Sequence, residues 1–267
     1  MKIGFIGGGN MAKAIIGGLK INGFDTTLIN VLELDTQKCK ELIADFGVLA
    51  SDKYDEILNT SVIILSVKPQ QLQEVCKKIA PLLSNQLVIS IAAGVKSIVI
   101  SRWLNHYKSI VRVMPNTPAQ IQAGVSALYA LADVTHAQRD QATKILAAVG
   151  ETLWIDDETK MDAITAISGS GPAYVFYLIE ALEEAGVELG LTPDEAKMLA
   201  LQTFTGASTL ATKSSVDVKT LRSQVTSKGG TTEQGILVLE KTNIKNIILQ
   251  AAQAAAEKSR TLGADLA

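Results

Sequence analysis

Histidine is scarce in this chain of 267 residues, and neither of its two copies stands near a motif. His106 lies in a mixed polar and aromatic stretch and His136 opens a helix-like run, so we expect both to face solvent. A Ser–His–Asp hydrolase needs a histidine base, and zinc enzymes draw on histidine ligands. Neither class is expected here, and any chemistry must come largely from a cofactor.

Cysteine and long apolar runs are also scarce. Cys39 and Cys76 form no Cys-x-x-Cys pair and no metal spacing, so we interpret them as reduced thiols of a cytoplasmic protein. No stretch reaches the roughly 18 apolar residues of a membrane span. The first predicted strand starts at once, which leaves no room for a signal peptide. We therefore expect a cytoplasmic protein without a membrane partner.

An excess of positive charge is missing as well. The chain has 25 Lys and Arg against 27 Asp and Glu, for a net charge of −2. This balance gives no electrostatic footprint for nucleic acid or an anionic membrane. The chain is 47% hydrophobic, and its length suffices for one large domain or two smaller ones with substantial cores.

The N-terminus carries the motif around which the chain is organised. Lys2–Ile6 predicts a buried strand, the glycine turn Gly7-x-Gly9-x-x-Ala12 follows, and a helix runs on to the glycine pair at Gly17. Strand, glycine turn and helix in this order are typical of a dinucleotide site, with the pyrophosphate at the helix N-terminus. A merely flexible glycine loop would not need the flanking strand and helix.

A second strand ends in an acidic residue. The run Thr27–Leu32 predicts this strand, and Glu33 closes it about 24 positions after the second motif glycine. An acidic residue here accepts hydrogen bonds from the adenosine ribose, which favours NAD over NADP. Lys38, Lys40 and Lys53 are possible partners for a 2′-phosphate, so the cofactor preference stays open.

The strand pattern continues to about residue 157. Buried strands are predicted at 47–50, 62–67, 87–92, 110–114, 125–131 and 152–155, with helices at 35–46, where Asp35 is the candidate cap, and 135–149. Ligands bind at the carboxyl ends of such strands. Lys68-Pro69 should therefore lie by the cofactor, unless it is only a surface turn. Asn116, in a stiff Pro-Asn-Thr-Pro loop, suits nicotinamide or substrate as well as a simple strand stop.

Beyond residue 157 the pattern becomes helical, with helices predicted at 161–167, 172–189, 193–213, 218–225, 233–241 and 244–262. The stretches 163–179 and 198–212 carry no charge. A domain of about 110 residues cannot enclose two such helices and keep a hydrophilic surface. We predict an α/β protein with a Rossmann-type doubly wound dinucleotide-binding domain at 1–157. An all-helical dimerisation and substrate-binding domain is predicted at 158–267.

Two glycine-rich turns interrupt the predicted helices. Ser168–Pro172 suits a helix start with Ser170 or Gly171 as cap. Thr226–Thr232 combines exposed N–H groups, a helix start and four hydroxyls, which suits a carboxylate. Thr231 or Thr232 could instead cap the following helix, but a cap needs one hydroxyl. The composition therefore favours an anion site.

Motifs in one order along nearly the whole chain resemble the pyrroline-5-carboxylate reductase family. They are residues 5–12, 67–70, 114–118, 168–174 and 225–232, of which the last two are the most specific. The resemblance implies NADPH- or NADH-dependent reduction of 1-pyrroline-5-carboxylate to L-proline, the last step of proline biosynthesis. It also implies a homodimer interlocked through the helical domain, assembling into a larger ring such as a decamer.

The resemblance also implies site residues. For the cofactor, beside Glu33 and Asn116, these are Ile6, Gly7, Gly8, Gly9, Asn10, Met11, Ser66, Val67, Lys68, Pro69, Ile91, Ala92 and Ala93. For the substrate they are Val225, Ser227, Gly229, Gly230, Thr231 and Thr232. The substrate carboxylate would meet Ser227 and the N–H groups of Gly230, Thr231 and Thr232. The Thr232 hydroxyl would approach the ring nitrogen as the catalytic group.

The chain departs from the family at two places. Lys228 stands where many relatives have proline, and it adds a charge that could attract the carboxylate or simply face water. A Glu-x-x-Pro-x-x-Leu run of many relatives is replaced by Ser215, Val218 and Leu221. Because of the second change, the sequence does not determine where the local helix starts or whether one contact of the site is kept.

Two other functions compete with this interpretation. A β-hydroxyacid dehydrogenase or an imine reductase would share the architecture, but Lys160, Lys197 and Lys213 lie in no recognisable acid/base motif. A non-catalytic dinucleotide sensor would need the N-terminal motif but not the hydroxyl-rich second turn. The sequence leaves feedback by proline undetermined.

Overall fold

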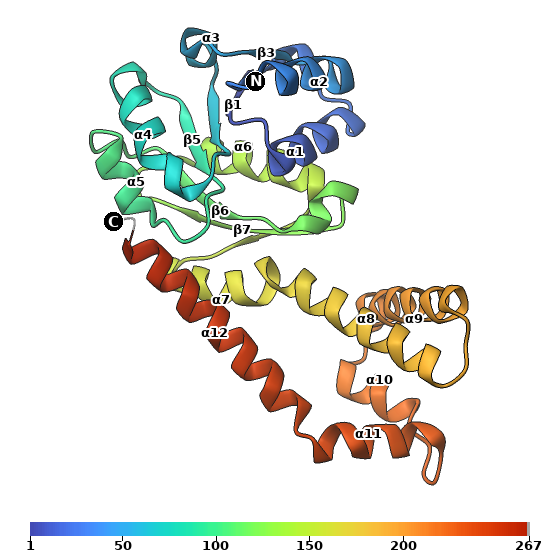
Figure 1. Ribbon diagram of the computed structural model, residues 1–267. Helices are drawn as coiled ribbons and strands as arrows, with labels where there is room; N and C mark the ends of the chain where they lie inside the picture. Colours follow the sequence, from blue (N-terminus) through green and yellow to red (C-terminus); the bar gives the residue numbers. More distant parts are fainter. Residues whose placement is uncertain (266–267) are drawn as a thin grey trace. The chain divides into compact units, whose positions relative to one another are not determined.

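The computed structural model of the chain describes residues 1–265 (Figure 1). It divides into two compact units, one formed by Met1–Ser170 with the chain from Gln253 onward and the other by Gly171–Ala252. The first unit thus continues past residue 157 and takes in the end of the last helix. These compact units differ from the predicted domains 1–157 and 158–267, and the domain boundary between residues 157 and 158 stays a prediction.

The first unit is built on an eight-stranded sheet with the order β3-β2-β1-β4-β5-β6-β7-β8. Its strands are β1 Ile3–Ile6, β2 Ile29–Leu32, β3 Leu49–Ser51, β4 Val62–Leu65, β5 Leu87–Ser90, β6 Ile110–Met114, β7 Gly124–Ala130 and β8 Gly150–Trp154. Neighbouring strands are parallel except β6 and β7. The predicted doubly wound sheet is confirmed.

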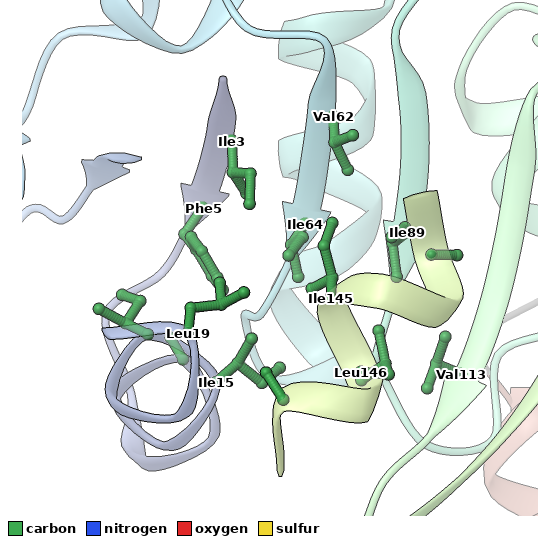
Figure 2. Close-up of a cluster of buried hydrophobic side chains, with 14 of the residues drawn as sticks. Ile3, Phe5, Ile15, Leu19, Val62, Ile64, Ile89, Val113, Ile145 and Leu146 are labelled. Atoms are coloured by element: carbon green, nitrogen blue, oxygen red, sulfur yellow. The ribbon is translucent and has the colours of Figure 1, made fainter. Parts of the chain in front are cut away.

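Alternation along the buried strands fills two cores, one on each face of the sheet. Ile3 and Phe5 of β1 share one core with Ile15 of α1 and Leu146 of α6 (Figure 2). Ile6 belongs to the other core, together with residues of α4 and α5. Both faces are covered by helices, which explains why these strands read as continuous apolar runs.

The helices of the first unit surround this sheet. They are α1 Asn10–Ile21, α2 Thr36–Phe46, α3 Tyr54–Leu58, α4 Pro69–Ile79, α5 Ser97–Trp103, α6 His136–Leu146 and α7 Met161–Ile164. Asp35 caps α2 as predicted, accepting hydrogen bonds from the N–H groups of Gln37 and Lys38. The sequence did not identify α3, α4 or α5.

Helix α1 continues through the glycine pair at which the sequence suggested an end. A Cβ atom on Gly18 would lie 2.5 Å from the carbonyl oxygen of Ala148. The glycine is therefore there to let α1 approach the chain that follows α6, rather than to break the helix.

The predicted turn at Ser168–Pro172 is not a turn. A π-helical segment, Thr165–Gly169, follows α7, and Ser170 stays in the helical region of φ and ψ. Helix α8 then begins at Gly171. A Cβ atom on Gly169 would collide with Cε of Met114 at the end of β6. Close packing on a strand end therefore accounts for this glycine. Ser170 directly precedes α8, and its hydroxyl makes no hydrogen bond within the described residues.

The second unit is helical. It holds α8 Gly171–Glu188, α9 Pro193–Lys213, α10 Val218–Gln224, α11 Thr231–Lys241 and the beginning of α12 Ile244–Asp265. Phe176 and Tyr177 of α8 are 63% and 71% exposed, and Met198 of α9 is 56% exposed. The uncharged stretches of α8 and α9 thus present apolar side chains that this chain alone does not cover. No helix in the described part of the chain has the length and apolarity that a membrane crossing requires.

Candidate functional site

A cavity of about 400 Å³ opens beside the carboxyl ends of β1 and β4. It is lined by Ile6, Gly7, Gly8, Gly9, Leu32, Glu33, Leu34, Lys38, Tyr54, Ser66, Val67, Lys68, Gln71, Glu74, Val75 and Lys78. Strand β1 lies between β2 and β4. The connection from β1 to β2 therefore runs to one side of β1, and the connection from β3 to β4 returns to its other side. This switch point is where doubly wound sheets bind dinucleotides.

The glycine turn after β1 fits a pyrophosphate. Gly7 has a φ of +99°, and a Cβ atom there would lie 2.9 Å from the carbonyl oxygen of Ser66. No atom lies within 4 Å of the Cβ position of Gly9, so this side of the turn is open. The N–H groups of Asn10 and Met11 have no protein acceptor in the described chain, and no side chain caps α1. Unpaired donors at a helix N-terminus are what a phosphate requires.

Glu33 lies at the rim of this cavity and contacts the glycine turn directly. Its Oε2 accepts a hydrogen bond from the N–H of Gly8 at 3.0 Å, and its Oε1 accepts one from the N–H of Asp35 at 3.1 Å. The carboxylate is therefore held in place before any ligand arrives. A fixed negative charge here suits a ribose hydroxyl and opposes a 2′-phosphate.

Several residues of the cavity wall were missed by sequence reasoning, among them Tyr54, Gln71 and Lys78. These three side chains come from α3 and α4, which the sequence did not identify, and no motif marks them. Lys78 Nζ lies 6.0 Å from the centre of the Tyr54 ring and 2.8 Å from Oε1 of Glu74. Of the three lysines considered for a 2′-phosphate, only Lys38 lines the cavity.

Ser66 and Asn116 have structural duties in addition to their predicted roles. The Ser66 hydroxyl donates to the carbonyl oxygens of Gly7 at 2.6 Å and Ile6 at 3.0 Å, which fixes the turn. Oδ1 of Asn116 accepts a hydrogen bond from the N–H of Val125 at 2.9 Å. Its Nδ2 amino group makes no hydrogen bond within the described residues and is left to donate to a ligand.

The remaining predicted cofactor residues do not line the cavity. They are Asn10, Met11, Pro69, Ile91, Ala92, Ala93 and Asn116. Ala92 is buried in the core beside α5, and Pro69 starts α4 as its first residue. Contacts of these residues with a cofactor stay a prediction.

The predicted substrate loop of the second unit joins α10 to α11. The N–H of Gly230 donates to the carbonyl oxygen of Ser227 at 3.0 Å, which closes a turn with Gly229 at φ +76°. The Thr226 hydroxyl donates to the carbonyl oxygen of Arg222 at 2.7 Å. The Gly230 N–H, assigned to the substrate by the resemblance, is therefore already paired within the loop.

The start of α11 leaves several donors unpaired. Its N-cap residue is Gly230, so the alternative in which Thr231 or Thr232 caps the helix is wrong. Within residues 171–252, the N–H groups of Thr231 and Thr232 and the hydroxyls of Ser227, Thr231 and Thr232 have no hydrogen-bond partner in the protein. Unpaired N–H groups and hydroxyls at a helix N-terminus suit a carboxylate.

The two departures from the family motif leave this loop intact. Lys228 is exposed and makes no ion pair within the described residues. Asp217 caps α10 by accepting a hydrogen bond from the N–H of Thr220 at 3.0 Å. The helix start is thus secured without the Glu and Pro that many relatives carry.

The other candidate groups lack catalytic surroundings. The hydrogen bond from Lys160 to Asp156 raises the lysine pKa, which keeps its proton bound and opposes acid/base work. His106 and His136 are exposed as predicted. Both cysteines are buried, and burial raises the pKa of Cys76 to about 12.

Comparison with known proteins assigns both parts of the chain. Residues 158–262 match the family model described as pyrroline-5-carboxylate reductase dimerisation, and residues 2–94 match that of an NADP oxidoreductase, coenzyme F420-dependent. The pyrroline-5-carboxylate reductase of Pseudomonas aeruginosa is 41% identical over 99% of this chain and 98% of its own. That of Haemophilus influenzae is 39% identical over 97% of both chains.

Solved structures agree with these matches. A pyrroline-5-carboxylate reductase from Coxiella burnetii superposes with a TM-score of 0.92, at 42% identity over 98% of both chains. The pyrroline carboxylate reductase of Plasmodium falciparum, solved with NADP bound, superposes with a TM-score of 0.88, at 32% identity over 98% of both chains. With relatives of 39% to 42% identity matching along nearly its whole length, the chain belongs to the pyrroline-5-carboxylate reductase family.

Proposed function

We propose that the chain reduces 1-pyrroline-5-carboxylate to L-proline with NADPH or NADH, the last step of proline biosynthesis. The observation that carries this proposal is the set of unpaired donors at Ser227, Thr231 and Thr232. Those donors suit the substrate carboxylate, and a dinucleotide sensor would have no use for them. Relatives named for this reaction match along nearly the whole chain.

The cofactor supplies a hydride from its nicotinamide to the carbon of the substrate C=N bond. The chain binds it through the open glycine turn and the N-terminus of α1, which receive the pyrophosphate. Glu33 receives the ribose. Because the Glu33 carboxylate is fixed by the N–H groups of Gly8 and Asp35, it cannot easily swing away from a 2′-phosphate. We therefore propose NADH as the preferred cofactor.

The substrate loop orients the imine. The N–H groups of Thr231 and Thr232 and the Ser227 hydroxyl hold the carboxylate, which leaves the Thr232 hydroxyl for the ring nitrogen. A protonated imine is the better hydride acceptor, so a group that places a proton at nitrogen assists the reaction. A neutral hydroxyl is a weak acid, and Thr232 acts mainly by orienting the ring or a water molecule.

The apolar faces of α8 and α9 support a homodimer. Phe176 and Tyr177 expose large side chains, and the region matches a dimerisation model. Burying such faces needs a second copy. We propose further assembly into a ring such as a decamer, and work in the cytoplasm. Mass measurement in solution tests the assembly, and folded, active monomers at micromolar concentration would contradict it.

The experiment that tests the reaction follows NADH and NADPH oxidation by absorbance with 1-pyrroline-5-carboxylate as substrate. We expect rapid turnover, with proline as product. A folded dimer that binds the cofactor but gives no turnover would contradict the proposal that 1-pyrroline-5-carboxylate is the substrate. Larger cyclic imines and hydroxy acids would then separate an imine reductase from a hydroxyacid dehydrogenase.

A further inference from the structure

We propose that Glu233 is a positioning residue that holds the tip of the substrate loop, an inference that rests on the proposed function. Glu233 is the third residue of α11 and is half-buried. Its Oε2 accepts a hydrogen bond from the N–H of Gly229 at 2.7 Å. A carboxylate of the protein itself thus occupies one N–H group of the loop that is proposed to bind a carboxylate substrate.

The position of Glu233 explains why it reaches Gly229. A glutamate three residues after the N-cap usually accepts a hydrogen bond from the N-cap N–H, as half of a capping box. Here the N-cap is Gly230, whose N–H is already donated to Ser227 at 3.0 Å. The carboxylate therefore reaches one residue further back toward the N-terminus and accepts from the N–H of Gly229. A negative charge in the first helical turn is also favourable by itself.

The two bonds together divide the donors of the loop into two sets. Gly229 and Gly230 have their N–H groups fixed within the protein, by Glu233 and Ser227 respectively. Thr231 and Thr232 keep theirs unpaired. The substrate carboxylate is thereby directed to the helix start rather than to the loop tip, and its position sets where the ring nitrogen lies.

The bond to Glu233 also supplies stiffness that the loop otherwise lacks. Two consecutive glycines sample many backbone conformations, and Gly229 must hold φ at +76°. The residue before these glycines is Lys228, which leaves the backbone free to rotate where a proline would fix φ. Glu233 restrains the same tip from the helix side. Ordering the loop in advance lowers the entropy that substrate binding must overcome.

Steady-state kinetics of two variants test this role. Glu233→Ala removes the acceptor, and we expect the KM for pyrroline-5-carboxylate to rise about tenfold, with kcat and the KM for NADH within about twofold. Glu233→Gln keeps a side-chain oxygen and should stay near the wild-type KM. Gln234→Ala, the next and exposed residue, is the matched control and should change neither constant.

The outcomes distinguish positioning from competition. If Glu233 instead competed with the substrate for the loop, both Glu233→Ala and Glu233→Gln would lower the KM, and this result would overturn the proposal. An unchanged KM in Glu233→Ala would overturn it too. Adding Lys228→Pro to Glu233→Ala should restore much of the lost affinity, since proline restrains the tip independently.

A readout without turnover keeps this role separate from the proposed reaction. Amide hydrogen exchange at Gly229 should accelerate in Glu233→Ala and stay slow in Glu233→Gln, whatever the substrate is. Equal exchange in all three proteins would overturn the contact itself. Failure of the wild-type enzyme to reduce pyrroline-5-carboxylate, with slow exchange that depends on Glu233, would refute the proposed function alone.

Discussion

Arg112 of β6 donates a hydrogen bond from Nη1 to Oε1 of Glu158 at 3.0 Å, and both side chains lie inside the first unit, 4% and 16% exposed. Glu158 also accepts hydrogen bonds from the N–H and the hydroxyl of Ser97, at 2.7 and 2.8 Å. One carboxylate thus ties β6, the start of α5 and the chain after β8 together. Each of its partners is neutralised or paired, as a buried charge requires.

Glu158→Ala should lower the free energy of unfolding by about 3 kcal/mol, because it leaves the Arg112 charge buried without a partner. Urea denaturation of the wild type and the variant measures the difference. The matched control is Asp156→Ala, which breaks the exposed pair with Lys160 and should change stability by at most about 0.5 kcal/mol. Equal changes in the free energy of unfolding for the two substitutions would mean that burying the Arg112–Glu158 pair does not make it more important for stability than an exposed pair.

Glu33→Ser should shift the cofactor preference toward NADPH. Removing the carboxylate abolishes repulsion of a 2′-phosphate and removes an acceptor for the ribose hydroxyl, so the ratio of KM values for NADPH and NADH should fall about tenfold. Separate saturation curves with each cofactor give this ratio. Glu41→Ser removes an acid on α2 and serves as control. A strong NADPH preference of the wild type would rule out the proposed role of Glu33.

Thr232→Ala should lower kcat/KM for pyrroline-5-carboxylate by about 10- to 100-fold, because the hydroxyl that orients the ring nitrogen is lost. Thr232→Ser keeps a hydroxyl at the same place and should retain most of the activity. Initial rates with NADH held at saturation measure both variants. If Thr232→Ala were as active as the wild type, Thr232 would have no part in the mechanism.

Gly263→Ala should weaken cofactor binding from a position outside the cavity. Gly263 of α12 packs against Gly94, and a Cβ atom would collide with the Gly94 carbonyl oxygen. Gly94 follows the predicted cofactor residues Ile91, Ala92 and Ala93. If Gly94 moves to avoid the added Cβ atom, the loop that carries these three residues should move with it. We expect the Kd for NADH, measured by fluorescence titration, to rise severalfold.

The exposed neighbour Ala264 provides the control for that substitution. Ala264→Ser should leave the Kd for NADH unchanged. A Gly263→Ala protein with reduced Tm but unchanged Kd would mean that α12 supports the fold and not the loop.

Cys76 should make the protein less stable in alkali. Burial raises the pKa of its thiol from the ordinary 9.0 to about 12. Below pH 9.0 native and unfolded chains both keep the proton, whereas between pH 9.0 and about 12 only the native chain does. The free energy of unfolding therefore falls as pH rises through this window, by about 1.4 kcal/mol per unit at most.

A substitution separates this effect from other titrating groups. Cys76→Ala costs about 1 kcal/mol at every pH through lost packing, but its stability should fall about 2 kcal/mol less between pH 8 and 10.5 than that of the wild type. Urea denaturation at the two values measures the slopes. Identical slopes would show that the Cys76 thiol ionises normally in the native chain.

The phosphate turn was predictable from sequence because its requirements are local. Gly7 must take a positive φ, Gly9 must leave backbone open, and a helix must begin directly after them. Each of these is a property of neighbouring residues. The same holds for the cap at Asp35 and for the helix predicted to begin at Pro193, whose first turn is closed by a capping box between Thr192 and Glu195.

Predictions failed where a glycine serves a distant partner. The sequence suggested a helix end at Gly18 and a turn at Gly169, yet both residues are helical and pack against Ala148 and Met114 respectively. Glycine looks the same in sequence whether it ends a helix or allows close packing. Only the neighbour across space distinguishes the two.

The sequence by itself determined the doubly wound sheet, the helical second half, the glycine turn after β1 and the hydroxyl-rich turn before α11, since periodicity and turn chemistry act over a few residues. Only the tertiary structure decided which donors of these sites stay unpaired. Gly230 closes a turn, Glu233 takes the Gly229 N–H, and Glu33 takes that of Gly8. Hydrogen bonds are exclusive and depend on distances, which the order of residues does not contain.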